Sequence, residues 1–139
     1  MQTFLPYQSF ELSAQCLDYR RLGKQRVEAL QILQALERKG GAWYNHPATK
    51  MWMSYENALK HYHNVCIEEC VRRRYKNNMM LFQVNVSDLY NKRPSWLGDE
   101  KFHASHRSNL LRKDPKYYGQ FGWTEPTDLP YVWPTYNET

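Results

Sequence analysis

One stretch of the chain combines a carboxylate with cationic and amide side chains at helical spacing. Arg21, Gln25 and Glu28 follow one another at intervals of four and three residues, so a helix would align them on one flank. Arg26 would project close to the apolar face of the same helix, where an unpaired charge is costly. A carboxylate bordered by Arg and Gln could move protons and hold phosphates in one place. The same pattern is also typical of a solvated helix flank with paired charges.

A second polar segment, HASHRSN, carries two histidines one helical turn apart. His103 and His106 stand beside Arg107, and Arg112 and Lys113 follow a few residues later. Such a dense basic and polar face suits contact with phosphates, and it is equally typical of an ordinary polar helix surface. Two histidines at this spacing are too few for a metal site without a third ligand.

A third group, His63, Cys66 and Cys70, would share one face of a longer helix, so a zinc site is conceivable there. That face also carries leucine and tyrosine side chains that are typical of a core. Small buried thiols are therefore the preferred interpretation, and no metal is expected. The chain has three cysteines, an odd number that excludes a complete intramolecular disulfide framework and favours a reducing cytoplasm.

The C-terminal part of the chain, from residue 116 onward, is expected to be irregular and rich in packed rings. These rings belong to Tyr117, Tyr118, Phe121, Trp123, Tyr131, Trp133 and Tyr136. Rings interleaved with Lys113 and Lys116 could stack on extruded bases. A small helical core also needs extra apolar area, and covering that core is the preferred role for most of them.

The elements that must position these residues are predicted to be helices. Leu22, Ala29, Leu33 and Leu36 share one face when residues are placed about 100° apart, which indicates an amphipathic helix. The glycine pair at 40–41 is expected to end that helix.

A second, longer helix is predicted to begin at Pro47, which suits a first helical position behind Asn45 or His46 as the cap. It is expected to end near Arg72. The prediction depends on an apolar stripe with alternating spacings of three and four, formed by Trp52, Tyr55, Leu59, Tyr62, Cys66 and Cys70.

Shorter elements complete the prediction. Ser9 or Ser13 is expected to cap a first helical turn. The segment SDLYNK should form a short helix that stops before Pro94. A third main helix should run from near Asp99 to Lys113, where the Asp-Pro that follows ends it.

Length and composition agree with this outline. The 139 residues are 42% apolar and 24% charged, which is typical of one globular domain spanning residues 1–139. No apolar run approaches the roughly 20 residues of a membrane span, and the start is not expected to be a signal peptide. Lys and Arg number 19 against 14 Asp and Glu, and this net charge of +5 favours a nucleic-acid partner. The predicted class is all-α, with about three main helices and an irregular aromatic tail.

Four segments, taken in order, resemble the pyrimidine-dimer DNA glycosylases of the phage endonuclease V type. They are the lead MQTFLPY, the stretch RLGKQRVEALQIL, the start NHPATKMW of the long helix that ends in EECVRRRY, and HASHRSNLLRKDPKYYG. The resemblance includes the bacterial and viral branch that shares the lead and the second stretch. Together the four segments span most of the chain.

The resemblance implies a bifunctional repair enzyme that needs no cofactor. In such enzymes the α-amine of the first residue, here that of Met1, attacks C1′ of the damaged nucleotide, displaces the base and leaves an imine. The carried-over glutamate is Glu28, which would assist sugar opening and the β-elimination that nicks the strand. The ordinary pKa of an α-amine is about 7.7–8.0, far below that of a lysine side chain, so a useful fraction of the amine is neutral at cellular pH.

The resemblance also implies a partner and its contacts. The partner is damaged double-stranded DNA, the base excised is a pyrimidine of a cyclobutane dimer, and the protein is expected to act as a monomer. DNA contacts are expected from Gln2, Arg20, Arg21, Gln25, Arg26, His106, Arg107, Arg112, Lys113 and Lys116. Three alternatives stay open: the same mechanism on another altered base, a basic nucleic-acid-binding protein without catalysis, and a zinc-stabilised interaction module.

Overall fold

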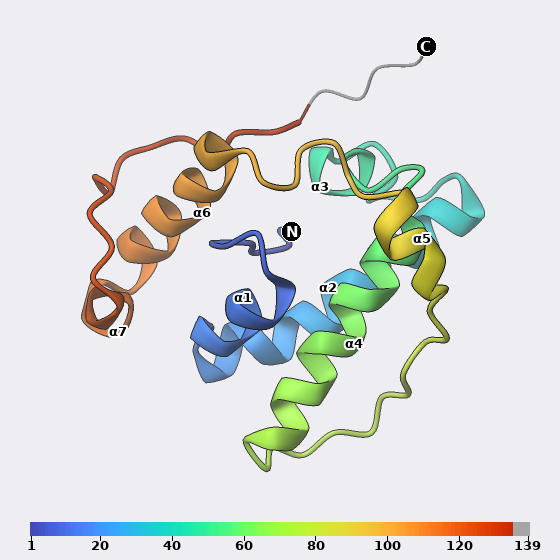
Figure 1. Cartoon of the computed structure of the whole chain (residues 1–139), viewed down its shortest axis with the longest axis horizontal. Helices are drawn as coiled ribbons and strands as arrows, with labels where there is room; N and C mark the ends of the chain where they lie inside the picture. The colour runs from blue at the N-terminus through green and yellow to red at the C-terminus, as the bar shows by residue number, and fades with distance from the viewer. Residues whose placement is uncertain (135–139) are drawn as a thin grey trace.

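The computed structural model describes residues 1–134 and folds them into helices, with no β-strand in this range (Figure 1). The predicted all-α class is confirmed. Within the same residues, no helix is long and apolar enough to cross a membrane. In chain order the elements are α1 (Phe10–Cys16), α2 (Tyr19–Arg38), α3 (Pro47–Lys50), α4 (Glu56–Arg72), α5 (Val86–Asn91), α6 (Glu100–Lys113), α7 (Pro115–Tyr118) and the 3₁₀ turn η1 (Gly119–Phe121).

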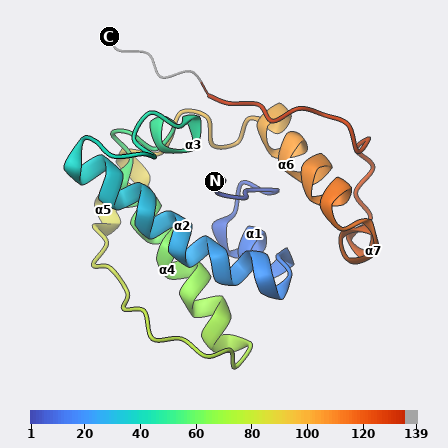
Figure 2. The same ribbon diagram turned by 180° about the vertical axis from the view of Figure 1, so that it is seen from behind.

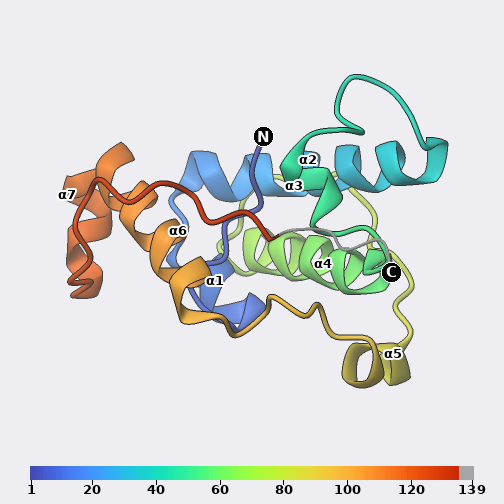
Figure 3. The ribbon, with the colours of Figure 1, turned by 90° about the horizontal axis from the view of Figure 1, so that it is seen from above.

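Helices α2 and α4 pack against each other and form the scaffold of the fold (Figure 3). The predicted apolar face of α2 is confirmed, since Leu22 and Ala29 are fully buried. Asp18 caps the start of the helix: its carboxylate accepts the N–H of Arg21 and so satisfies one of the free donors of the first turn. Its end differs from the prediction. Lys39, rather than a glycine, takes the left-handed conformation with a φ of 55°.

The long helix predicted from Pro47 is broken into α3 and α4, so this prediction is wrong in part. α3 begins at Pro47 as expected, and the His46 ring caps it by accepting a backbone N–H of the first turn at 3.0 Å. The chain then turns at Ser54, which has a φ of 73°. The break turns the Trp52 indole into the core, where it is fully buried and donates its Nε1–H to the hydroxyl of Thr3 at 3.0 Å. Such a long-range bond is invisible to a periodicity argument.

The other helices follow the sequence patterns more closely. Ser9 caps α1, the predicted short helix is present as α5, and α6 runs to Lys113 with Asp99 as its cap. The chain does not become irregular directly after α6. Asp114 caps one more turn, α7, and η1 follows before the extended tail begins.

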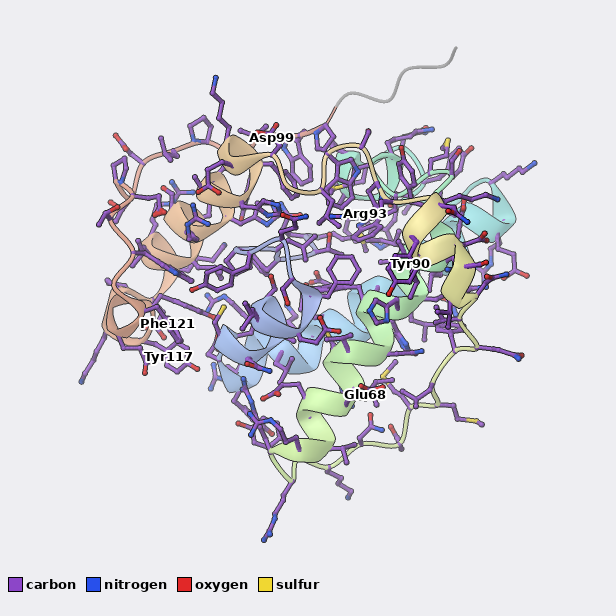
Figure 4. The ribbon with its side chains drawn as sticks, viewed as in Figure 1. Glu68, Tyr90, Arg93, Asp99, Tyr117 and Phe121 are labelled. Atoms are coloured by element: carbon purple, nitrogen blue, oxygen red, sulfur yellow. The ribbon has the colours of Figure 1, made fainter. Side chains whose placement is uncertain are left out.

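Rings of the tail pack as the sequence predicts for most of them. Tyr118 is fully buried and stacks on Trp123, with ring centroids 5.8 Å apart and planes 9° apart. Tyr117 and Phe121 lie together beside α7, with centroids 5.9 Å apart (Figure 4). Tyr136, also predicted to pack, lies outside the described residues.

Residues 1–7 form an extended segment that runs through the middle of the molecule, between α2 and α6 (Figure 2). Four successive residues, from Gln2 to Leu5, are each at most 6% exposed. Within residues 1–134 no β-strand is available to pair with this segment. Its backbone groups must therefore bond to side chains, because a buried peptide group without a partner costs about 1–3 kcal/mol.

Candidate active site

Gln25 of α2 binds the N-terminal segment at two points. Its side-chain oxygen accepts the N–H of Phe4 at 2.8 Å, and its side-chain nitrogen donates to the carbonyl of Gln2 at 2.9 Å. The amide of Gln25 thus offers one donor and one acceptor to the backbone, as a neighbouring strand would. Gln25 is 1% exposed, and its side chain holds the segment. Its contact with DNA stays a prediction, since Gln25 also lines the cavity described below.

Tyr62 of α4 supports the same arrangement from the other side. Its hydroxyl lies 2.6 Å from the side-chain oxygen of Gln25 and 2.8 Å from the carbonyl of Phe4, and its single proton can be donated to either. Burial raises the pKa of Tyr62 well above its ordinary value, so the hydroxyl keeps its proton and remains a donor. The scaffold pair α2 and α4 thereby fixes the register of the segment.

Two histidines of α6 hold the next residue, Leu5, and we call them the histidine clamp. His106 accepts the N–H of Leu5 at its Nδ1, 2.8 Å away, and His103 donates from its Nδ1 to the carbonyl of Leu5, also at 2.8 Å. The Nε2 of His103 accepts the N–H of Gly98 at 3.0 Å, so its proton is on Nδ1. Both rings are neutral in this arrangement. Burial lowers the pKa of both, that of His106 to about 3.

Arg107 completes the hold of α6 on the segment. Its guanidinium donates to the carbonyl of Pro6 at 2.6 Å and forms ion pairs with Glu100 and with Glu125 of the tail. It is 8% exposed. This ion-pair network joins the N-terminal segment, α6 and the C-terminal tail.

These contacts place the start of the chain beside Glu28. The N–H of Gln2 donates to Oε2 of Glu28 at 3.1 Å, and the side-chain nitrogen of Gln25 lies 3.4 Å from the same oxygen. Met1 precedes that N–H by one residue, and both Met1 and Glu28 are partly exposed. The α-amine of Met1 and the carboxylate of Glu28 therefore border the same cavity, where a substrate can reach both.

A cavity of about 460 Å³ opens over this pair. Such a volume lies in the usual range for ligand sites, roughly 300–1,000 Å³. Among the described residues, Glu28 is the one acidic side chain that lines it, against four cationic side chains. Its lining is formed by Met1, Gln2, Phe4, Arg20, Arg21, Lys24, Gln25, Glu28, Lys113 and Tyr131. The arrangement suits an anionic substrate that presents an electrophilic carbon to the amine.

The structure brings together most, but not all, of the residues predicted for the site. Arg26 lies on the other flank of α2, where its guanidinium donates to Asn77 and to the carbonyl of Gly23. Arg112 donates to the carbonyl of Thr127 in the tail, so it is partly used to hold that segment. Lys116 is exposed on α7 and does not line the cavity.

For His106 and Arg107 the structure corrects the predicted DNA contact. His106 is fully buried, and Arg107 is 8% exposed and bonded on three sides. Neither side chain reaches a surface on which DNA could lie, and both instead hold the N-terminal segment. The polar pattern of this helix face does not distinguish the two roles, because such a face can bind a buried backbone as well as a phosphate.

Three residues of the neighbourhood were not predicted as site residues. Lys24 lines the cavity. It stands four residues from both Arg20 and Glu28, and this helical spacing would have allowed its prediction from the sequence. Tyr131 lines the cavity although the sequence favoured a core role. The pKa of His46 is lowered, first by burial and then by the positive charge of the Met1 amine, while Glu28 opposes the shift. Both charges therefore act on His46. No pattern in the sequence indicates that this ring lies near the reacting groups.

The zinc alternative finds no support in the geometry. In the part of the chain that the structure describes, no three His, Cys, Asp or Glu side chains converge to hold a metal ion. Cys66 and Cys70 are buried and free, as the preferred interpretation expected. Burial raises the pKa of both thiols, which keeps them protonated and inert.

Comparison with known proteins bears on the first three-fifths of the chain. Residues 1–83 match a family whose description is pyrimidine dimer DNA glycosylase. The match includes Met1 and Glu28 and ends before α6. No curated protein and no solved structure gave a significant match.

The histidine clamp predicts how stability depends on pH. Because the folded-state pKa values lie below the unfolded value of about 6.5, the unfolded chain binds more protons beneath that pH. The free energy of unfolding should be highest above pH 6.5 and fall as the pH drops towards 3. For His106 alone the loss between pH 6.5 and 5 is about 1–2 kcal/mol. Urea unfolding followed by circular dichroism at several pH values measures it.

A matched variant, His106→Asn, keeps an acceptor near the position of Nδ1 but does not titrate. Its stability should depend less steeply on pH than that of the wild-type protein over the same range. An unchanged slope would show that His106 is not held neutral by the fold.

Proposed function

Because the chain belongs to the pyrimidine dimer DNA glycosylase family, we propose that it excises a damaged pyrimidine through an imine on the α-amine of Met1 and then nicks the strand by β-elimination. The observation that carries this proposal is the 3.1 Å bond from the N–H of Gln2 to the carboxylate of Glu28. It ties the start of the chain to the carboxylate, and both Met1 and Glu28 line one cationic cavity. The substrate is double-stranded DNA with a cyclobutane pyrimidine dimer.

The first step joins the Met1 nitrogen to the sugar. The lone pair of the neutral amine forms a bond to C1′, and the glycosidic bond breaks with its electron pair going to the base, which then takes a proton. The amine is accessible at the protein surface, while the backbone behind it is fixed by Gln25 and the histidine clamp. Such fixation lowers the entropic part of the barrier, because the nucleophile is already aligned.

Glu28 handles the protons of the steps that follow. The nitrogen loses a proton, the bond from C1′ to the ring oxygen opens, and that oxygen is protonated as the imine forms. A carboxylate beside the nitrogen can take the first proton, deliver the second and stabilise the positive iminium. The imine then makes the C2′ hydrogen acidic. Its removal expels the 3′-phosphate with the C3′–O electron pair, and water later releases the amine.

The cationic rim of the cavity would bind the phosphates that flank the lesion. Arg20, Lys24 and Lys113 line the cavity, and Arg21 joins them while paired with Asp18. Contacts of this kind position the duplex without reading its sequence. They also make binding weaken steeply as salt rises, because each neutralised phosphate releases counterions.

Borohydride trapping tests the proposal directly. Protein with a native N-terminus, verified by mass spectrometry, should form a stable crosslink with duplexes that carry a thymine dimer or an abasic site. An uncleaved extension before Met1 should abolish both crosslinks, because the amine is displaced. A crosslink to the abasic duplex alone would point to another base. Failure on both duplexes would leave a nucleic-acid-binding protein without this chemistry.

Glu28→Gln should abolish strand cleavage while leaving DNA binding nearly intact. The amide oxygen can still accept the N–H of Gln2, so the fold and the position of the amine are kept, whereas proton transfer is lost. The cleavage rate should fall about 100-fold or more. Glu37→Gln, an exposed change on the same helix, serves as the control and should cleave at the wild-type rate. Cleavage by the Glu28 variant at the control rate would remove this carboxylate from the mechanism.

Arg20 and Arg107 should respond to alanine substitution in opposite ways. Arg20→Ala should lower the slope of log affinity against log salt by about 0.9, because one phosphate contact is lost. Arg107→Ala should leave that slope unchanged and lower the free energy of unfolding by about 3 kcal/mol or more, since the largely buried carboxylate of Glu125 and the carbonyl of Pro6 lose their partner. Fluorescence anisotropy across a salt series and urea unfolding measure the two effects. The reverse pattern would place Arg107, and not Arg20, on the DNA.

A further inference from the structure

We propose that a groove beside α5 docks a peptide segment of a partner protein, one in which apolar side chains alternate with carboxylates. The groove has a volume of about 300 Å³ and is lined by residues from the ranges 8–11, 58–61 and 86–97. We call it the α5 groove. The inference goes beyond the proposed function, because it assigns a second partner to a surface that takes no part in the chemistry.

The outer wall of the groove is a helix that adds nothing to the core. None of the six residues of α5 is buried. Two hydrogen bonds join the helix to α4, since the side chain of Asn57 donates to the carbonyl of Asn85 at 2.9 Å and accepts its N–H at 2.8 Å. A helix this short is not stable alone in water, so contacts of this kind hold it. It is therefore fixed in place while its apolar side chains stay available.

An apolar row runs along the face of α5 that borders the groove. Leu89 and Tyr90 stand three and four residues after Val86, so the helix places all three side chains on one face. All three line the groove. Val86 is 66% exposed and Tyr90 is 80% exposed (Figure 4). Large apolar side chains that are exposed together mark interaction sites on soluble proteins.

The base of the groove is apolar and already packed. Phe10 and Ala58 line it, and both side chains are buried. The ring of Phe10 also lies against that of His61, with centroids 5.6 Å apart. An apolar side chain that enters the groove therefore leaves water and meets a fixed surface, which keeps the ordering cost of binding low.

The groove also offers a guanidinium group to a ligand. Arg93 is exposed and lines the groove, and it forms neither a hydrogen bond nor an ion pair with any other residue in the range 1–134. Glu11 is the one acidic side chain among the lining residues, and it lies 3.6 Å from His61. A guanidinium matches a carboxylate with two parallel hydrogen bonds, so the ligand expected at Arg93 is a carboxylate.

The chain around the groove carries the same sign of charge. Residues 73–98, which join α4 to α6, hold five cationic side chains against one acidic side chain, that of Asp88. They account for +4 of the net charge of +5. Such a segment attracts a partner of negative charge. A peptide that is both acidic and apolar complements both properties of the groove.

A peptide fits this surface better than a second stretch of DNA. Phosphates need several cations placed along a backbone, whereas Arg93 is the one Lys or Arg side chain that lines the groove in the part of the chain that the structure describes. Helix α5 also lies on the side of the molecule away from the N-terminus (Figure 3). A partner docked there leaves the cavity open to damaged DNA.

A labelled peptide tests the proposal. The probe is a fluorescein-labelled hexapeptide with the sequence Leu-Asp-Phe-Asp-Leu-Asp, and fluorescence anisotropy follows its binding to the full chain. The peptide with lysine in place of each aspartate should bind about 10-fold more weakly or worse, because it places a cation against Arg93. Equal binding of the two peptides would overturn the proposal.

Two exposed side chains of the groove should carry this binding. Tyr90→Ala should weaken binding of the aspartate peptide about 10-fold or more, and Arg93→Gln should weaken it about 5-fold. The matched controls are Tyr19→Ala and Arg38→Gln, which change exposed residues of α2 and should bind as the wild-type protein does. All four variants should keep the wild-type circular dichroism spectrum. Groove variants that bind as tightly as the controls would contradict the assignment.

A competition measurement separates the groove from the cationic cavity, which is the other place where an acidic peptide could bind. Binding of the aspartate peptide should persist in Arg20→Ala and in the presence of saturating duplex. Loss of binding in either case would place the peptide in the cavity and refute the docking site. If Tyr90→Ala and Arg93→Gln weaken the binding of duplex instead of peptide, the groove belongs to DNA. A protein that binds the peptide in this way but forms no borohydride crosslink would contradict the proposed reaction alone.

Discussion

The fold depends on one demand, which is that a buried and unpaired stretch of backbone must find hydrogen-bond partners. Residues 2–5 lie in the interior without a neighbouring strand, so side chains of α2, α4 and α6 supply most of their backbone hydrogen bonds. Gln25 acts as one partner and the histidine clamp as the other. Each helix is thereby fixed in position by what it must offer to the segment, and Glu28 is brought to the start of the chain as a consequence.

In this arrangement the groups that would react and the groups that hold them differ in burial. The groups that would react, the Met1 amine and Glu28, are few and partly exposed, while the groups that hold them are numerous and buried. An amine at the end of an anchored backbone has less freedom than one on a lysine side chain. The family match over residues 1–83 includes the reacting pair and Gln25, whereas the clamp and Lys113 lie beyond it. Some of the side chains that hold or line the site therefore lie outside the matched residues.

The sequence predicts what depends on neighbours along the chain and misses what depends on distant ones. Periodicity predicted α2, the Asp-Pro pair predicted the end of α6, caps predicted several helix starts, and the resemblance led to Glu28. His103 and His106 were misread because their partner, the peptide of Leu5, lies about 100 residues away. The break before α4 was missed for the same reason, since the bond of Trp52 to Thr3 shows in no local pattern.

The distance along the chain between Leu5 and His106 has a consequence for biosynthesis. The first residues leave the ribosome long before α6 does, yet they cannot dock fully until α6 has emerged, because three of their hydrogen bonds come from it. Contacts this far apart in sequence form late and slowly during folding. The nascent chain therefore exposes its amine without the assembled pocket around it, and the pocket is complete only when synthesis has passed Tyr131, which lines it. Completion of the chain, rather than its start, sets the moment at which the site exists.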